Sequence, residues 1–225
     1  MNWDAIRKHK IFKGIDPDHL KRMLECSKTR YRKYKKGSIL FQQEDPACYL
    51  YVLLSGRVVI ARQLISGRKN TLYEVTENHI FGEHYIFGEN NVYQYGAQAS
   101  TDVEVLEIPC CFFYSFCSEN CGHHQTLMRN VLSILAMKEW LSIKKLNIVS
   151  ASSLKERVSI WLMDEATDQG IVSLKMNREE LADYLGVARP SLSRALMRMQ
   201  EEGILEVGKK HIKILDFGKI EVFCT

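Results

Sequence analysis

The segment from residue 123 to residue 149 constrains the fold most strongly, because it lacks glycine and proline and carries two apolar stripes at helical spacing. The stripes are Leu127, Val131, Ile134, Leu141 and Ile148, and Met128, Leu132, Leu135, Leu146 and Val149. Such a helix would extend roughly 40 Å, longer than a small domain needs. We expect one stripe to pack on the chain's own domain and the other to form a dimer seam over about 127–149, interrupted by Lys138, Glu139 and Ser142. A single buried core helix is the alternative.

The distribution of charge separates the chain into parts with different partners. No Lys or Arg occurs between Asn70 and Met128, although the chain has 31 such residues and a net charge of +4. No apolar run approaches the roughly 20 residues that span a bilayer, and the N-terminus lacks the apolar centre of a signal peptide. We therefore expect a cytoplasmic protein with no membrane partner, whose seven cysteines are thiols rather than structural disulfides.

Periodicity predicts different structures on the two sides of the long helix. The pattern of residues 1–28 predicts short helices, and that of residues 29–109 predicts many short strands with turns at Ser55-Gly56 and Ser66-Gly67. Strands at this spacing indicate a small barrel or β-roll. After the long helix, residues 150–153 resemble a hinge and cap, and residues 154–167 another amphipathic helix. The sequence thus predicts an α+β chain with domains at 1–122, 123–149 and 150–225.

Residues 178–199 have the pattern of a helix-turn-helix, in which two helices cross closely and need small residues where their backbones meet. Ala182 and Gly186 occupy those places, and Gly186 also suits the end of the first helix. Asn177 is placed to cap the first helix, and Pro190 suits the first turn of the second.

The second of these helices has two different faces. Leu192, Leu196 and Met199 lie on one side, and the opposite side carries Ser191, Arg194 and Arg198, with Arg189 at the amino end. Arginines at the start of a helix in the major groove contact guanine N7 and O6, so Arg189 and Arg194 are candidates for base contacts and Arg198 for a phosphate contact. Residues 203–214 then predict a hairpin whose turn, Lys209-Lys210, forms a basic wing. An ordinary helical hairpin with solvated arginines is the alternative.

The combined pattern resembles the CRP/FNR family of bacterial regulators. The resemblance is most specific in KKGSILFQQEDPACYLYVLLSGRVVIARQ (35–63), FGEHYIFGE (81–89) and the helix-turn-helix from residue 178. It implies a cyclic-nucleotide-binding-like β-roll (double-stranded β-helix), a long dimerisation helix and a winged helix-turn-helix. It further implies a homodimer that binds palindromic double-stranded DNA, responds to a signal in the roll and has RNA polymerase as a partner. Arg189 and Arg194 match base-contacting positions, whereas Pro190 replaces the base-reading Glu of many members, so we expect a different operator.

The resemblance also indicates where an effector would bind. Cyclic-nucleotide-binding members follow a ribose-binding Gly-Glu pair, here Gly82-Glu83, with a phosphate-binding Arg-Ser or Arg-Thr pair, which Tyr93-Gln94 replaces here. A buried phosphodiester without a paired cation would cost several kcal/mol. We therefore expect a signal other than cyclic AMP, an unknown small-molecule effector, and Glu83 as a structural acceptor. The candidate effector site comprises Glu83, Tyr93, Gln94 and Ser142, which falls close to where members touch adenine.

Aromatic residues and cysteines leave further alternatives open. Tyr85, Phe87, Tyr93 and Tyr95 either line a pocket for a neutral or cationic ligand or belong to the core. Cys110, Cys111, Cys117 and Cys121, with His123 and His124, would hold a metal, act as a thiol switch or simply pack. Oxygen-sensing members carry their cluster cysteines near the N-terminus, where this chain has only Cys26, so we assign no metal and no cofactor.

Two other functions compete with a ligand-gated regulator. One is a redox- or metal-sensing regulator that uses these cysteines, and the other is a DNA-binding protein with no working effector site. The sequence contains no Gly-x-Gly-x-x-Gly run, no phosphate-binding loop and no Gly-x-Ser-x-Gly motif, so we do not expect an enzyme.

Overall fold

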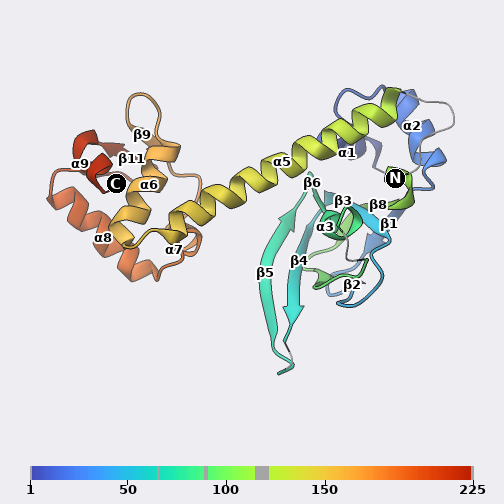
Figure 1. The fold of residues 1–225 in the computed structure, drawn as a ribbon, viewed down its shortest axis with the longest axis horizontal. Coiled ribbons are helices and arrows are strands. Elements are labelled where there is room, and N and C mark those ends of the chain that lie inside the picture. The colour runs from blue at the N-terminus through green and yellow to red at the C-terminus, as the bar shows by residue number, and fades with distance from the viewer. Residues whose placement is uncertain (1, 65, 89–90, 115–121, 224–225) are drawn as a thin grey trace. The chain divides into compact units, whose positions relative to one another are not determined.

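The computed structural model describes residues 2–64, 66–88, 91–114 and 122–223 (Figure 1). The chain forms two compact units, residues 1–135 and 136–225, and the long helix α5 (Gly122–Ser150) contributes to both. This helix occupies the segment that the two apolar stripes predict. The α+β fold with an N-terminal roll, a long helix and a C-terminal helix-turn-helix is confirmed. None of the described helices is both long enough and apolar enough to cross a membrane.

The first unit is built on two four-stranded sheets. One has the order β1-β8-β3-β6 and the other β2-β7-β4-β5, in which β4 and β5 form a long hairpin (Figure 1). The strands of the first sheet are β1 (Arg30–Tyr34), β3 (Tyr49–Ser55), β6 (His79–Phe81) and β8 (Val103–Pro109). Those of the second are β2 (Ile39–Phe41), β4 (Arg57–Gln63), β5 (Lys69–Thr76) and β7 (Gly96–Ala99). Every pairing within both sheets is antiparallel.

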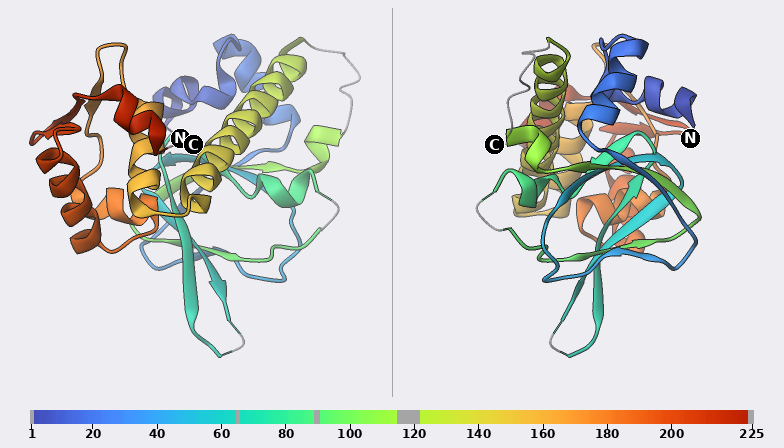
Figure 2. Two further views of the ribbon diagram at one scale, coloured as in Figure 1. Left: turned by 60° about the vertical axis from the view of Figure 1, so that its left-hand side comes forward. Right: turned by 90° about the vertical axis from the view of Figure 1, so that its right-hand side faces the viewer.

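The first sheet separates two hydrophobic cores, because successive side chains of a strand point to opposite faces. On β3, Tyr51 and Leu53 belong to the interior of the roll, whereas Leu50 and Val52 belong to a helical layer on the other face. That layer contains α1 (Trp3–Lys8), the 3-10 helix η1 (Lys10–Phe12), α2 (Pro17–Cys26) and the first half of α5. Figure 2 shows these short helices beside the amino-terminal part of α5.

The first half of α5 is fixed to the roll by one of the predicted stripes. Leu127 and Val131 are fully buried and Ile134 is nearly so, all in the helical layer. The side-chain amide of Asn130 donates to the carbonyls of Ile11 and Lys13, at 2.9 and 2.8 Å. Apolar burial and a pair of hydrogen bonds thus attach α5 to the N-terminal segment.

The turn between β3 and β4 depends on Gly56. Its φ of +84° lies in the left-handed region, and a Cβ at this position would lie 2.3 Å from the carbonyl oxygen of Asp102. The turn that the sequence predicts at Ser55-Gly56 therefore requires glycine for both conformation and space.

The second unit has a single hydrophobic core beneath a three-stranded sheet of order β10-β11-β9. Its elements after α5 are α6 (Leu154–Glu165), β9 (Ile171–Ser173), α7 (Arg178–Leu185), α8 (Arg189–Glu201), β10 (Leu205–Val207), β11 (His211–Ile214) and α9 (Phe217–Val222). Ser153 caps α6 in a reciprocal capping box with Glu156, as a cap at residues 150–153 predicts. Arg157 donates to the carbonyls of Ala151 and Leu185, which joins the hinge, α6 and α7.

Candidate functional site

Helices α7 and α8 form the helix-turn-helix that the sequence predicts. Asn177 accepts from the backbone amides of Glu179 and Glu180, and Glu180 accepts in return from the amide of Asn177 at 2.8 Å. Gly186 ends α7 with a φ of +68°. A Cβ there would have its nearest neighbour at 3.7 Å, in the side chain of Arg157, so the expected close approach of two backbones at Gly186 is wrong. Glycine is needed at this position for its conformation rather than for space.

Helix α8 presents a basic face because its apolar residues are buried. Leu192, Leu196 and Met199 are at most 2% exposed and lie in the core of the second unit. Arg189, Arg194 and Arg198 are exposed, and Ser191 is half-buried. The helix thus separates its residues into the two faces predicted from its sequence, with three guanidinium groups available to an outside partner.

Two of these arginines have acidic neighbours within the chain. Arg189 Nη1 lies 3.3 Å from Glu179 Oε2 on α7, and Arg198 Nε lies 3.9 Å from Glu202 Oε1 one turn further along. Both side chains of the first pair are exposed to solvent, Arg189 by 60% and Glu179 by 69%. Exposed pairs of this kind contribute little stability, so neither arginine is locked in place.

Strands β10 and β11 form the predicted hairpin, and Lys209 and Lys210 occupy its exposed turn. The turn is closed by the amide of Gly208, which donates to the carbonyl of His211 at 2.9 Å. Gln200 of α8 accepts from the amide of Val207 at 2.9 Å, so the hairpin is attached to the helix that precedes it. The two lysines therefore extend from a supported hairpin rather than from a free loop.

Aromatic rings fill the interior of the roll. Tyr93 is 1% exposed, stacks on Phe41 with ring centroids 3.8 Å apart, and donates its hydroxyl to the carbonyl of Tyr49 at 3.2 Å. Tyr85 and Tyr95 are buried in the same core with centroids 5.0 Å apart, whereas Phe87 packs in the helical layer. The structure therefore places these aromatic residues in the two cores, the second of the alternatives that the sequence leaves open.

The predicted effector residues have different surroundings. Glu83 is fully buried at the start of α3 (Glu83–Ile86), and its carboxylate lies 3.5 Å from the imidazole of His84. A Cβ on the adjacent Gly82 would lie 3.7 Å from the ring of Tyr93, so the Gly-Glu pair borders that ring. Gln94 is exposed. Ser142 lies on the part of α5 that belongs to the second unit, and its hydroxyl donates to the carbonyl of Lys138 within the same helix.

Glu107 is a second buried acid of the roll, which the sequence did not lead us to expect. It is 4% exposed and accepts from the hydroxyl of Tyr34 at 2.6 Å. Burial, followed by this hydrogen bond to Glu107, raises the pKa of Tyr34 far above its ordinary value. The alternation of residues along β8 could have predicted the burial of Glu107, because Glu107 shares a face with Val103 and Val105, which point into the roll. Among the described residues, the only buried charged side chains of the roll are thus acidic.

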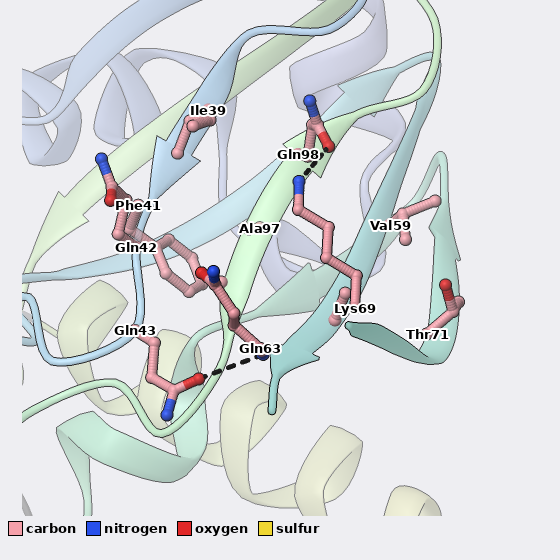
Figure 3. Close-up of a pocket in the computed structure, with 12 residues that line it drawn as sticks. Ile39, Phe41, Gln42, Gln43, Val59, Gln63, Lys69, Thr71, Ala97 and Gln98 are labelled. Atoms are coloured by element: carbon pink, nitrogen blue, oxygen red, sulfur yellow. Dashed lines mark hydrogen bonds between the residues drawn. The ribbon is translucent and has the colours of Figure 1, made fainter. Parts of the chain in front are cut away.

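A groove of about 220 Å³ lies on the outer face of the second sheet (Figure 3). It is lined by polar side chains that include Gln43, Gln63, Gln98 and Lys69, and Lys69 Nζ donates to Gln98 Oε1 at 3.4 Å. Val59 of β4 borders the groove, whereas its neighbours Val58 and Ile60 point into the roll. Phe41 and Ala97 of the aromatic core also line the groove, so the groove borders that core, although none of the predicted effector residues lines it.

The cysteine cluster is only partly described. Cys110 is half-buried and Cys111 exposed, both as free thiols, while Cys117 and Cys121 lie outside the described residues. Within the described part of the chain, no three His, Cys, Asp or Glu residues are grouped so that they could hold a metal ion. His123 stacks on His19 of α2, with ring centroids 3.7 Å apart, and His124 on Phe112 of α4 (Cys111–Tyr114), at 4.6 Å.

Two protein-family models match the chain, one in each unit. A cyclic nucleotide-binding domain matches residues 31–120, and a Crp-like helix-turn-helix domain matches residues 156–223. The matched segments contain the roll and the α7–α8 pair with its wing.

Curated proteins and solved structures show the same similarity along most of the chain. The Cyclic AMP receptor protein of Thermus thermophilus is 26% identical over 94% of each chain, and the Global nitrogen regulator of Synechococcus elongatus is 23% identical over 82% of this chain and 85% of that protein. The crystal structure of the Thermus thermophilus Catabolite Activator Protein shares the fold with a TM-score of 0.52 and 22% identity, covering 96% of this chain and 98% of that one. A CooA mutant from Carboxydothermus hydrogenoformans has a TM-score of 0.56 with 22% identity over 88% of each chain.

Proposed function

Since this chain belongs to the CRP/FNR family of DNA-binding transcription regulators, we propose that it is a homodimeric regulator that reads a palindromic DNA site and is gated by a signal in its roll. Members of this family are transcription regulators rather than enzymes. The observation that carries the proposal is the exposed basic face of α8, which lies beside a basic hairpin.

The DNA-binding face supports specific roles for its residues. Arg189 and Arg194 lie in the first half of α8, the part of a recognition helix that enters the major groove, so we assign them to base edges, with Ser191 between them. Arg198 follows one turn later, and we assign it to a phosphate together with Lys209 and Lys210 of the wing. Arginine contacts to guanine would give sequence preference, whereas the phosphate contacts would give affinity that decreases with salt.

The apolar surface of α5 supports the homodimer. Large apolar side chains of this helix are at least half exposed in the single chain: Leu132, Met137, Trp140, Leu141, Ile143 and Leu146. Met137 and Leu141 are four residues apart and Ile143 and Leu146 are three apart, the two spacings that are typical of a two-stranded seam. Apolar area of this extent is rarely left in water, and a second copy of α5 would cover it.

Gating would pass through the first sheet of the roll. Tyr51 and Leu53 of β3 contact the aromatic interior, and Leu50 and Val52 of the same strand pack in the layer that holds Leu127 and Val131 of α5. A ligand that favours one arrangement of the interior would therefore change how α5 packs. Through α5 it would change the separation of the two recognition helices of the dimer. That separation must match one turn of DNA, roughly 34 Å. Only a ligand with different affinity for the two states would shift their populations.

We propose that this signal is not a cyclic nucleotide. The ring of Tyr93 is buried in the core of the roll, and the buried charges of the described roll, Glu83 and Glu107, are both negative. An anionic phosphodiester would meet repulsion there, whereas a neutral or cationic molecule would not. The dense packing around Tyr93 also favours a second candidate, a DNA-binding protein with no working effector site.

One selection experiment tests the proposed function. The full-length protein would be incubated with random double-stranded DNA, and bound sequences would be recovered and sequenced, with and without cyclic AMP. We expect an inverted repeat whose half-sites are about 10 base pairs apart, with no effect of cyclic AMP. Failure to enrich any sequence would exclude a sequence-specific DNA-binding function, and enrichment only with cyclic AMP would exclude the proposal that the signal is not a cyclic nucleotide.

The proposal also includes a cytoplasmic location and contact with RNA polymerase, both of which are supported by the family resemblance.

A further inference from the structure

Cys48 and Cys110 lie opposite each other where β3 begins and β8 ends. The two strands are antiparallel, and Tyr49 is the partner of Pro109. One step further out, the amide of Cys110 donates to the carbonyl of Cys48 at 2.8 Å. The fold therefore makes direct cross-strand neighbours of two cysteines that are far apart in the sequence.

The distance between such neighbours suits a covalent bond. Residues at a hydrogen-bonded position of an antiparallel pair have Cα atoms about 5.5 Å apart, and disulfides join Cα atoms about 4.4–6.8 Å apart. Both thiols are free in the structure, with Cys48 exposed and Cys110 half-buried. We infer that Cys48 and Cys110 are an oxidant-sensitive dithiol, which closes to an intrachain disulfide between the start of β3 and the end of β8.

The two thiols have different roles in the reaction with a peroxide. The exposed Cys48 thiolate attacks one peroxide oxygen, the O–O bond breaks, and a sulfenic acid and hydroxide form. The Cys110 thiolate then attacks the sulfenic sulfur, which forms the S–S bond and releases a second hydroxide. With the two thiol protons, the products are one disulfide and two water molecules, so the two thiols lose two electrons and the peroxide gains them.

The surroundings of Cys110 fit this order of events. Burial, and then the nearby thiols of Cys111 and Cys48, raise the pKa of Cys110 above its ordinary value. The exposed Cys48 is therefore the thiol that meets the oxidant first, and the half-buried Cys110 is the thiol that resolves the sulfenic acid. Conversion of Cys48 to the uncharged sulfenic acid removes one of the neighbouring charges that oppose ionisation of Cys110. An exposed disulfide of this kind is also readily reduced by thiols.

The bond would form beside the aromatic interior. The residue after Cys48 is Tyr49, whose carbonyl accepts from the hydroxyl of Tyr93. Any effect of this disulfide on DNA binding rests on the proposed function, whereas formation of the disulfide does not.

Peptide mapping of the full-length protein tests the inference. The protein would be treated with hydrogen peroxide, its remaining thiols blocked with iodoacetamide, and the product digested with chymotrypsin and a Glu-specific protease, because trypsin has no cleavage site between residues 70 and 128. We expect a peptide of Cys48 linked to one of Cys110, and its loss after treatment with dithiothreitol. Cys48→Ser and Cys110→Ser should each abolish the link. Cys111→Ser, which changes the adjacent thiol, and Cys26→Ser should leave it intact.

Two results would overturn the inference. One is full alkylation of Cys48 and Cys110 under conditions that oxidise other cysteines. The other is a link that joins Cys110 to a cysteine other than Cys48, or that survives in Cys48→Ser. Circular dichroism of the serine variants, which we expect to match the wild type because Cys48 is exposed, separates loss of the bond from loss of the fold.

Discussion

Glu179 of α7 holds Arg189 of α8 in an exposed ion pair, with Oε2 and Nη1 3.3 Å apart. A candidate base-reading guanidinium thus has an acid of the preceding helix beside it. This carboxylate would oppose DNA phosphates without locking the arginine in place.

Glu179→Gln should strengthen DNA binding about three- to tenfold, because it removes a negative charge from the DNA-binding face at a cost of about 1 kcal/mol or less in stability. Fluorescence anisotropy at several salt concentrations, on specific and random DNA, would measure this. Glu201→Gln, at the far end of α8, is the control for charge alone. Unchanged or weaker binding by Glu179→Gln would show that the acid does not oppose DNA.

Arg194→Ala should cost about 1–3 kcal/mol of binding to the selected site and relax the preference at one base pair of each half-site, because a bidentate contact to guanine is lost. Arg198→Ala is the matched comparison on the same helix. It should weaken binding to all sequences alike and reduce the dependence of affinity on salt. Anisotropy on a panel of single-base variants would distinguish the two. Equal effects of the two substitutions would refute the assignment of Arg194 to a base.

Leu146→Arg should convert the proposed dimer to a monomer and reduce DNA affinity at least tenfold, since the substitution would bury a charge in the proposed α5 seam and one recognition helix alone binds weakly. Leu146 is 65% exposed in the single chain, so the change should not unfold it. Val222→Arg, at a 70% exposed apolar position on α9, is the control. Light scattering coupled to size exclusion would report the mass, and a Leu146→Arg dimer would place the interface elsewhere.

Gly56→Ala should destabilise the protein by about 3 kcal/mol or more, because the new Cβ would lie 2.3 Å from a backbone oxygen that cannot rotate away. Gly37 has a similar φ of +87°, but a Cβ on Gly37 would have no neighbouring atom within 4 Å, so Gly37→Ala should cost only about 1 kcal/mol. Urea denaturation of both variants gives the two free energies of unfolding. Similar losses at the two sites would mean that the turn at Gly56 adjusts.

Stability should fall between about pH 6.5 and pH 4 because of His9, which is 2% exposed. Burial is the main cause that lowers the pKa of His9 from 6.5 to about 4. A hydrogen bond to the backbone of His79 acts in the opposite direction, and the charges of Lys10 and His79 lower the pKa further. Between pH 6.5 and pH 4, the unfolded chain binds a proton at His9 that the folded chain does not bind. This difference lowers the free energy of unfolding by about 3 kcal/mol at pH 4. The contribution is fully present above pH 6.5. The comparison is urea denaturation of the wild type and His9→Gln at pH 7.5, 5.5 and 4.5, with exposed His211→Gln as the control. Equal pH dependence in all three proteins would exclude His9.

Local patterns predicted those parts of the molecule that depend on neighbours along the chain. The spacing of apolar residues located α5 and separated the two faces of α8, and Asn177, Ser153 and Gly186 marked the helix ends, because caps and helical periodicity need only the next few residues. The alternation of residues along β8 places Glu107 on the same face as Val103 and Val105. It would predict a buried Glu107 only if the face of the strand that points into the roll were already known.

The tertiary structure decided what depends on distant strands. The resemblance predicted from the sequence that Tyr93 and Gln94 stand where related proteins carry a phosphate-binding pair. Only the folded chain shows the ring of Tyr93 stacked on Phe41 inside the roll while Gln94 is exposed. The fold likewise brings Cys110 next to Cys48, which does not belong to the cluster of cysteines around Cys110 in the sequence. The physical reason is that antiparallel pairing and burial are set by the register between strands, which joins residues that no local pattern relates.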